Sequence, residues 1–185
     1  MTAPAFPLPS APRPARAGDI VVGMADLRLA RGGEGGGRLI TYALGSCLGI
    51  TVWDPAAGVG GMLHVMLPSS AIDAGKAARN PAMFVDAGVP LLFKKSYELG
   101  AKKERLVVRV AGGAFSGARE EDDQFQIGKR NFLTLRKLLW KNNVLLHAHD
   151  VGGCQTSRTM RLDLATGEVS VRVSGKDGTF RDGTL

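Results

Sequence analysis

Short runs in which apolar residues alternate with polar ones, or follow one another directly, recur along the chain and are typical of β-strands. Six of these runs are Ile20 to Ala30, Leu39 to Leu44, Arg105 to Val110, Val144 to His149, Arg158 to Leu164 and Glu168 to Val173. The last two flank Ala165-Thr166-Gly167, which predicts a closing hairpin.

Two longer segments repeat their apolar residues at helical spacing. The first follows Asn80-Pro81, a pair typical of a helix start, and is stopped by Gly100. We expect a kink at Pro90, because an interior proline removes a backbone hydrogen bond. The second helix is predicted from Ile127 to Asn142, with a core face formed by Phe132, Leu135 and Leu139.

The order of the elements indicates the fold class. Ser69 to Arg79, a polar segment with many small residues, is predicted as a loop before the first helix. Along the whole chain, the predicted order is several strands, a helix, a strand, a second helix and further strands. This order predicts a single-domain α/β layered sandwich of mixed β-sheet with helices packed on a face.

A further pair of strand-like runs surrounds the turn Asp54 to Gly58 and predicts a β-hairpin. Cys47, one of two cysteines, and His64, one of three histidines, are equally distant from a point between Pro55 and Ala56. A hairpin centred at this point would place them directly opposite each other, with Cβ atoms about 4.5–5.5 Å apart. On the first arm, Leu48, Ile50 and Val52 are predicted to face the core, and the other face, with Cys47, Gly49, Thr51 and Trp53, is predicted to open toward a site.

A thiol beside an imidazole indicates nucleophilic chemistry, because the imidazole can accept the proton of the thiol. The small residues Gly45 and Ser46 precede Cys47, and backbone N–H groups there could face a developing oxyanion. The alternative is purely structural: a hairpin with one buried cysteine and one core histidine. The spacing alone leaves both interpretations open.

A resemblance to a known family favours the chemical interpretation. Thr41, Leu44-Gly45-Ser46-Cys47, the Asp54-Pro55 turn and the segment from Gly60 to Pro68 resemble the signature of the CheD family, the chemoreceptor glutamine deamidases of bacterial chemotaxis. The resemblance continues through Ala111 to Ala114, Ile127 to Asn131 and Asp150 to Gly153, and it spans roughly residues 19 to 173.

The resemblance implies a protein-glutamine glutaminase that acts without metal or organic cofactor. It assigns the nucleophile to Cys47, the base to His64 and an orienting role to Thr41. The implied partners are the cytoplasmic helices of chemoreceptors, as substrate, and a phosphatase of the CheC type. Whether methyl esters of receptors are also cleaved stays open, as does the alternative of a non-catalytic module that binds receptors or the phosphatase.

Length and composition set the domain boundaries and the expected location. With 185 residues, the chain is expected to form one domain over residues 19–173 and to be a monomer. Residues 1–18 are rich in Pro and Ala and are predicted to be disordered, and residues 174–185 are predicted to form a polar tail. Without an export signal or an apolar run near the ~20 residues that span a bilayer, we expect a cytoplasmic protein with free thiols and no membrane insertion.

The formal net charge of +7 suggests a nucleic-acid partner or an acidic protein partner. We expect no nucleic-acid binding, since no zinc finger, aromatic RNA-binding motif or helix-turn-helix is present. Much of the charge is spread over the two predicted helices, and a solvated face accounts for most of it. An acidic protein partner remains possible.

Three other segments contain residue types that can bind ligands. The glycine-rich segment Arg31 to Arg38 lacks the Lys-Ser/Thr ending of a phosphate loop, and the acidic run Glu120 to Asp123 does not match a calcium loop. His147 and His149 could bind zinc with Asp150 or Cys154, but His-x-His on a strand is common and a second pair of ligands is missing. The role of Arg158 is left open.

Overall fold

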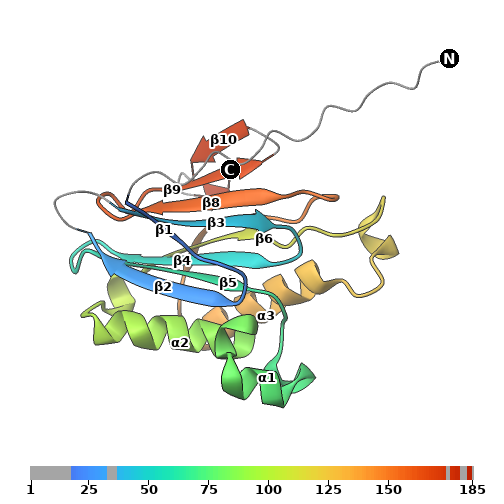
Figure 1. The fold of residues 1–185 in the computed structure, drawn as a ribbon, viewed down its shortest axis with the longest axis horizontal. Coiled ribbons are helices and arrows are strands. Elements are labelled where there is room, and N and C mark those ends of the chain that lie inside the picture. The colour runs from blue at the N-terminus through green and yellow to red at the C-terminus, as the bar shows by residue number, and fades with distance from the viewer. Residues whose placement is uncertain (1–17, 33–36, 174–175, 180–182, 185) are drawn as a thin grey trace.

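The computed structural model describes residues 18–32, 37–173, 176–179 and 183–184. Two β-sheets stack face to face, and helices cover the outer face of one of them (Figure 1). The molecule therefore has three layers, which confirms the predicted α/β layered sandwich. Residues 1–17 of the N-terminal segment that is predicted to be disordered lie outside the described residues, as do residues 33–36 of the glycine-rich segment.

The first sheet has five strands in the order β1-β3-β8-β9-β10. Its strands are β1 (Asp19–Val21), β3 (Arg38–Leu44), β8 (Arg158–Asp163), β9 (Val169–Val173) and β10 (Lys176–Thr179). β1 runs parallel to β3, and the other neighbours are antiparallel. The closing hairpin predicted around residues 165–167 is the pair β8 and β9.

The second sheet has six strands in the order β11-β7-β6-β4-β5-β2. Its strands are β2 (Asp26–Arg31), β4 (Leu48–Asp54), β5 (Val59–Val65), β6 (Val107–Gly112), β7 (Leu146–Val151) and β11 (Gly183–Thr184). β7 runs parallel to both β6 and β11, while the remaining pairs are antiparallel. The predicted polar tail thus contributes one strand to each sheet, β10 and β11.

The helices are α1 (Ala74–Arg79), α2 (Val85–Glu98) and α3 (Ile127–Lys141), and short 3-10 helices occupy Ser70–Ile72, Pro81–Met83, Lys103–Arg105 and Glu120–Asp122. α2 and α3 pack on the second sheet, and α2 continues through Pro90 without a break. None of the helices in the described part of the chain is long and apolar enough to cross a membrane.

Two apolar clusters hold the layers together. Leu48, Ile50 and Val52 of β4 belong to the cluster between the second sheet and the helices, as predicted. Trp53, on the opposite face of β4, belongs to the cluster between the two sheets. The predicted openness of this face is wrong, because the first sheet covers it and every residue of β4 is buried.

Two local predictions are also wrong. The run Ile20 to Ala30 is not one strand, because the chain turns at Ala25, in a left-handed conformation with φ 53°, and β1 and β2 enter different sheets. The segment Ser69 to Arg79 is not a loop, because Ser69 and Asp73 accept hydrogen bonds from backbone N–H groups and cap a 3-10 helix and α1.

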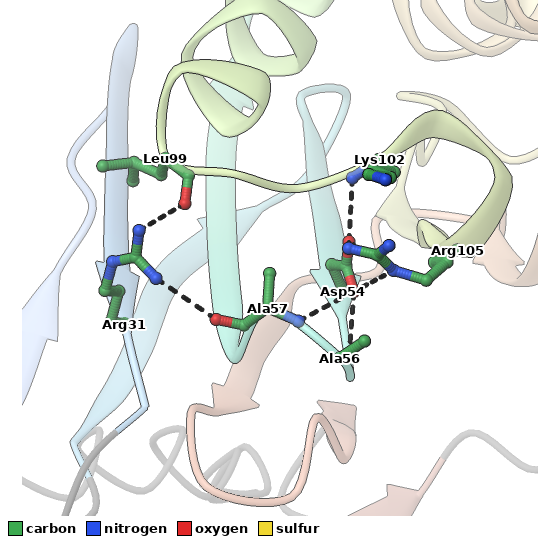
Figure 2. Close-up of polar contacts among 7 residues, drawn as sticks. All are labelled: Arg31, Asp54, Ala56, Ala57, Leu99, Lys102 and Arg105. Atoms are coloured by element: carbon green, nitrogen blue, oxygen red, sulfur yellow. Dashed lines mark hydrogen bonds and ion pairs between the residues drawn. The ribbon is translucent and has the colours of Figure 1, made fainter.

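The turn of the β4–β5 hairpin is fixed by Asp54. Its carboxylate accepts hydrogen bonds from the backbone N–H groups of Ala56 and Ala57, from Lys102 N and from the guanidinium of Arg105 (Figure 2). On the neighbouring strand, Arg31 donates to Leu99 O and Ala57 O. The turn comprises residues 55–58, so its centre lies one residue later than predicted.

Candidate active site

Thr41 and His64 are hydrogen-bonded across the space between the two sheets. Thr41 Oγ1, on β3, lies 2.8 Å from His64 Nδ1, on β5, and both residues are completely buried. The threonine hydroxyl also donates to Val22 O at 2.7 Å. Since a hydroxyl has one proton, Oγ1 must accept from Nδ1–H, which leaves the lone pair of the imidazole on Nε2.

The environment of His64 keeps its imidazole neutral. Burial lowers the pKa of His64 to about 4, since the charged form loses its hydration. Among the described residues, Nε2 has no hydrogen-bond partner. A neutral imidazole with an unengaged Nε2 can accept a proton from a nearby group, as a general base does.

Cys47 lies at the same end of the hairpin, just before β4, and is half-buried against the cluster between the sheets. Burial raises the pKa of its thiol, and a contact with its own backbone N–H lowers it to a smaller extent. The resting thiol is therefore protonated at neutral pH. It makes no hydrogen bond to Nε2 in this structure.

The predicted direct opposition of Cys47 and His64 is wrong. His64 lies opposite Gly49, and Cys47 precedes Gly49 by two positions. Because the turn centre lies one residue later than predicted, each residue of β5 pairs two positions further along β4. A shift of two positions keeps every side chain on its predicted face of the sheet. A side chain at position 49 would crowd this site, since a Cβ there would lie 2.8 Å from Leu44 Cδ1 and 3.3 Å from Thr41 Cγ2.

The loop that carries Cys47 is held by the segment after β6. Gly113 N donates to Cys47 O, and Ala114 N donates to Gly45 O, both at 2.8 Å. A Cβ on Gly112 would lie 2.1 Å from Cys47 O, so a glycine is required at this close approach. The N–H groups of Ser46 and Cys47 donate to no carbonyl or side chain of another described residue, so they can face an oxyanion.

Asn131, on α3, joins the two segments that carry Cys47 and His64. It is fully buried, and its Nδ2 donates to Ser46 O and to Met66 O, both at 3.0 Å. Ser46 immediately precedes Cys47, and Met66 lies two residues after His64. A single side chain thus fixes the two segments relative to each other.

Comparison with known proteins connects this arrangement to a family. Residues 66–173 match the family model described as CheD chemotactic sensory transduction. A Syntrophus aciditrophicus protein named "probable chemoreceptor glutamine deamidase CheD 1" is 46% identical over 85% of this chain and 96% of its own length. The chain belongs to the CheD family. A Solibacter usitatus member is 46% identical over 85% of this chain and 90% of its own length, and one from Pyrococcus abyssi is 42% identical over 83% and 91%.

Membership in the CheD family matches the resemblance seen in the sequence, and the structure shows what Gly128 and Asn131 of the Ile127–Asn131 motif do in this chain. Gly128 allows α3 to approach the Gly113 backbone, where a Cβ would lie 2.4 Å from Gly113 O. Asn131 follows three residues later and was missed as a site residue. Its position at the end of the Ile127–Asn131 motif was the one sign of a role in the site. The sequence does not reveal its partners, because Met66 and Ser46 lie 65 and 85 residues away.

Arg158, whose role the sequence left open, forms a buried ion pair beside this CheD-family site. Its Nε and Nη2 each donate to Asp150 at 2.8 Å, and its Nη1 donates to Gly152 O. Gly152 N in turn donates to Gly112 O, next to the loop that holds Cys47. The Asp150-x-Gly-Gly motif thus supports the site through the backbone.

The side chains considered as zinc ligands have other contacts. His147 Nδ1 accepts from Val108 N, the His149 ring packs edge-on against Phe132, and the exposed Cys154 donates to Gly117 O. No three His, Cys, Asp or Glu side chains of the described residues come together as a metal site.

Proposed function

We propose that the protein hydrolyses the side-chain amide of glutamines in chemoreceptors to glutamate and ammonia, with Cys47 as nucleophile, His64 as general base and acid, and Thr41 as the residue that positions His64. The observation that carries the proposal is the Thr41–His64 hydrogen bond, which leaves a neutral, unengaged Nε2 at the end of the hairpin that bears Cys47. The names of the relatives, glutamine deamidases that act on chemoreceptors, supply the substrate class.

In the first half of the reaction, Cys47 transfers its proton to His64 Nε2 as the sulfur attacks the carbonyl carbon of the glutamine side chain. The oxyanion that forms is held by the N–H groups of Ser46 and Cys47, with Gly45 shaping the approach. The imidazolium then donates its proton to the nitrogen, and ammonia leaves as the C–N bond breaks. Burial, which lowers the pKa of His64, also makes its imidazolium a better proton donor than a solvated one, and this favours protonation of a poor leaving group.

In the second half, water hydrolyses the thioester. His64 Nε2 accepts a proton as the oxygen of water attacks, and the Cys47 sulfur leaves and recovers that proton. The products are the glutamate side chain and the free thiol. Every proton moves between Cys47, His64, water and substrate, and the step requires no other reactant.

Thr41 is a neutral partner for the imidazole, unlike the aspartate found in many triads. Its hydroxyl fixes the tautomer and the ring orientation but adds no negative charge to stabilise the imidazolium. The charged pair is therefore expected only during turnover, in agreement with the raised pKa of Cys47 and the lowered pKa of His64.

The proposal is tested by mass spectrometry of a purified chemoreceptor cytoplasmic fragment after incubation with the protein. We expect conversion of selected glutamines to glutamates with wild type and none with Cys47→Ala. A receptor-binding module without activity is the alternative. It would bind the fragment and leave every glutamine intact in both samples.

A further inference from the structure

The exposed face of α3 is unusually cationic and carries two large apolar side chains. α3 contains five basic residues and no acidic one. Leu133 and Trp140 are exposed by 51% and 80%. The basic residues, all exposed, are Lys129, Arg130, Arg136, Lys137 and Lys141.

Helical geometry arranges these side chains in order. Leu133 and Trp140 are seven residues apart, so they lie on one line about 10 Å apart along the helix axis. At 100° per residue, Lys129 and Arg136 fall on one side of this line, while Arg130, Lys137 and Lys141 fall on the other side. We call this set of seven residues the α3 face.

Most of the charge on the α3 face is not neutralised within the described part of the chain. Lys129 pairs with Glu120 at 3.0 Å, and the Arg136 guanidinium lies 5.9 Å from the centre of the Phe132 ring. Arg130, Lys137 and Lys141 form no ion pair with a described residue. An uncompensated cationic surface around an exposed tryptophan has the composition of a binding site for an acidic partner.

We propose that the α3 face is a docking surface for glutamate-bearing helices of the protein substrate, separate from the site at which Cys47 reacts. The proposal rests on the proposed function for the identity of the substrate. The reaction turns neutral glutamine into glutamate, so substrate helices become more acidic as it proceeds. The line of Leu133 and Trp140 matches the seven-residue repeat of a helix that packs alongside α3.

The position of α3 supports this assignment. The first turns of α3 touch the site from the buried side of the helix, since Asn131 contacts Ser46 O, and Lys129 and Arg130 immediately precede Asn131 in sequence. The α3 face points away from the sheet, about 160° around the helix from Asn131, so it is a second surface beside the site and not a part of it. A lipid surface is less suitable, because the apolar side of α3, including Leu135 and Leu139, is already buried on the sheet and only two apolar residues remain outside.

The test measures binding without turnover, with the full chain carrying Cys47→Ala and a chemoreceptor cytoplasmic fragment as the probe. Two forms of the fragment are compared, one with glutamine and one with glutamate at the modification sites. We expect the glutamate form to bind more tightly, and the emission of the exposed Trp140 to shift to shorter wavelength on binding. Trp53, only 7% exposed, contributes a constant background.

Charge reversal supplies the decisive comparison. Lys137→Glu with Lys141→Glu should weaken binding of the glutamate form about tenfold or more, because two attractive pairs become repulsive. The matched control, Arg79→Glu on α1 with Lys94→Glu on α2, reverses two exposed cations that form no ion pair with a described residue, changes the net charge equally and should change the affinity by less than about twofold. Thermal unfolding checks that all variants are folded.

Several results would overturn the docking surface: no binding of either fragment, equal losses in both pairs, or unchanged affinity after reversal on α3. The same charge reversal can be tested for binding to anionic lipid vesicles and to a DNA oligonucleotide. If it abolished binding to either of these but left binding to the receptor fragment intact, the docking surface would also be overturned. The assay for deamidation by wild type is separate. Deamidation with an unchanged KM in the reversed variant would refute docking alone, whereas tight docking without deamidation would refute the proposed function alone.

Discussion

The hydroxyl of Thr41 accepts a hydrogen bond from His64 Nδ1, with 2.8 Å between the two atoms, and thereby connects the first sheet to the second. Because the single proton of Thr41 is donated to Val22 O, the direction of the bond to His64 is fixed. The backbone of residue 22 thus determines which imidazole nitrogen acts as the base.

Replacement of Thr41 by valine keeps the shape of the side chain and removes this hydrogen bond. We expect Thr41→Val to lower kcat about tenfold or more, because Nδ1 loses its acceptor and the other tautomer becomes accessible. Thr41→Ser retains the hydroxyl and should recover most of the activity. The comparison requires kcat on the receptor fragment for both variants, and equal rates for Thr41→Val and wild type would contradict the positioning role.

The pH dependence of activity should reflect the low pKa of His64. The base must be neutral, so kcat/KM is expected to fall on the acid side near pH 4 and not near 6.5. The measurement is kcat/KM between pH 4 and 8 under conditions in which the protein is folded. If kcat/KM instead fell with a midpoint near pH 6.5, His64 would titrate as a solvent-exposed imidazole does, and the prediction would be wrong.

Stability should also change with pH in this range. The pKa of His64 is lower in the folded protein than in the unfolded chain, so the unfolded chain binds a proton first as the pH falls. Stability is therefore expected to decrease from pH 6.5 to about 4. A His64→Gln variant, compared by urea unfolding, should lose part of this decrease, and an identical pH profile would argue against a buried neutral imidazole.

Asn131 should affect turnover more than substrate binding. Asn131→Asp replaces the two donated hydrogen bonds by repulsion between a carboxylate and the carbonyls of Ser46 and Met66. A displacement of Cys47 relative to His64 should lower kcat about tenfold or more with a small change in KM. The control is Asn142→Ala, which removes a hydrogen bond to Leu138 O at the exposed end of the same helix. Similar kinetics for the two variants would exclude a positioning role for Asn131.

The sequence predicted the layered fold and the hairpin formed by β4 and β5. It could not predict the pairing of β4 and β5, since the turn depends on Arg105 and Lys102, which contact Asp54 from about 50 residues further along the chain. The burial of Trp53 and Thr51 was missed for a related reason. The pattern along one strand does not reveal that a second sheet covers its polar-looking face.

The contribution of Asp54 can be measured against a natural control. Asp163 accepts from Ala165 N and Thr166 N in the β8–β9 turn, as Asp54 does from Ala56 N and Ala57 N. Asp163 is more exposed, however, and it pairs with no arginine among the described residues. We expect Asp54→Asn to lower the free energy of unfolding by about 2 kcal/mol and Asp163→Asn by clearly less. Equal costs in urea unfolding would mean that the turn contacts alone matter.

Asp54 should also make the fold sensitive to strong acid. Burial raises the pKa of its carboxyl, but the hydrogen bonds from Arg105 and from the backbone of Lys102, Ala57 and Ala56 outweigh this effect and lower it to about 2. The associated stability is present above pH 4 and is lost as the pH falls toward 2.

The most direct test of the account is to stop the reaction while the substrate is attached to the enzyme. Stoichiometric protein and receptor fragment are mixed, quenched with acid at short times and analysed by mass spectrometry after digestion. We predict a thioester between Cys47 and the side chain of a receptor glutamine that has lost ammonia, formed and consumed before glutamate accumulates, and absent with Cys47→Ala. Two results together would contradict the account: deamidation by Cys47→Ala at the wild-type rate, and no adduct on Cys47 of the wild-type protein at any time.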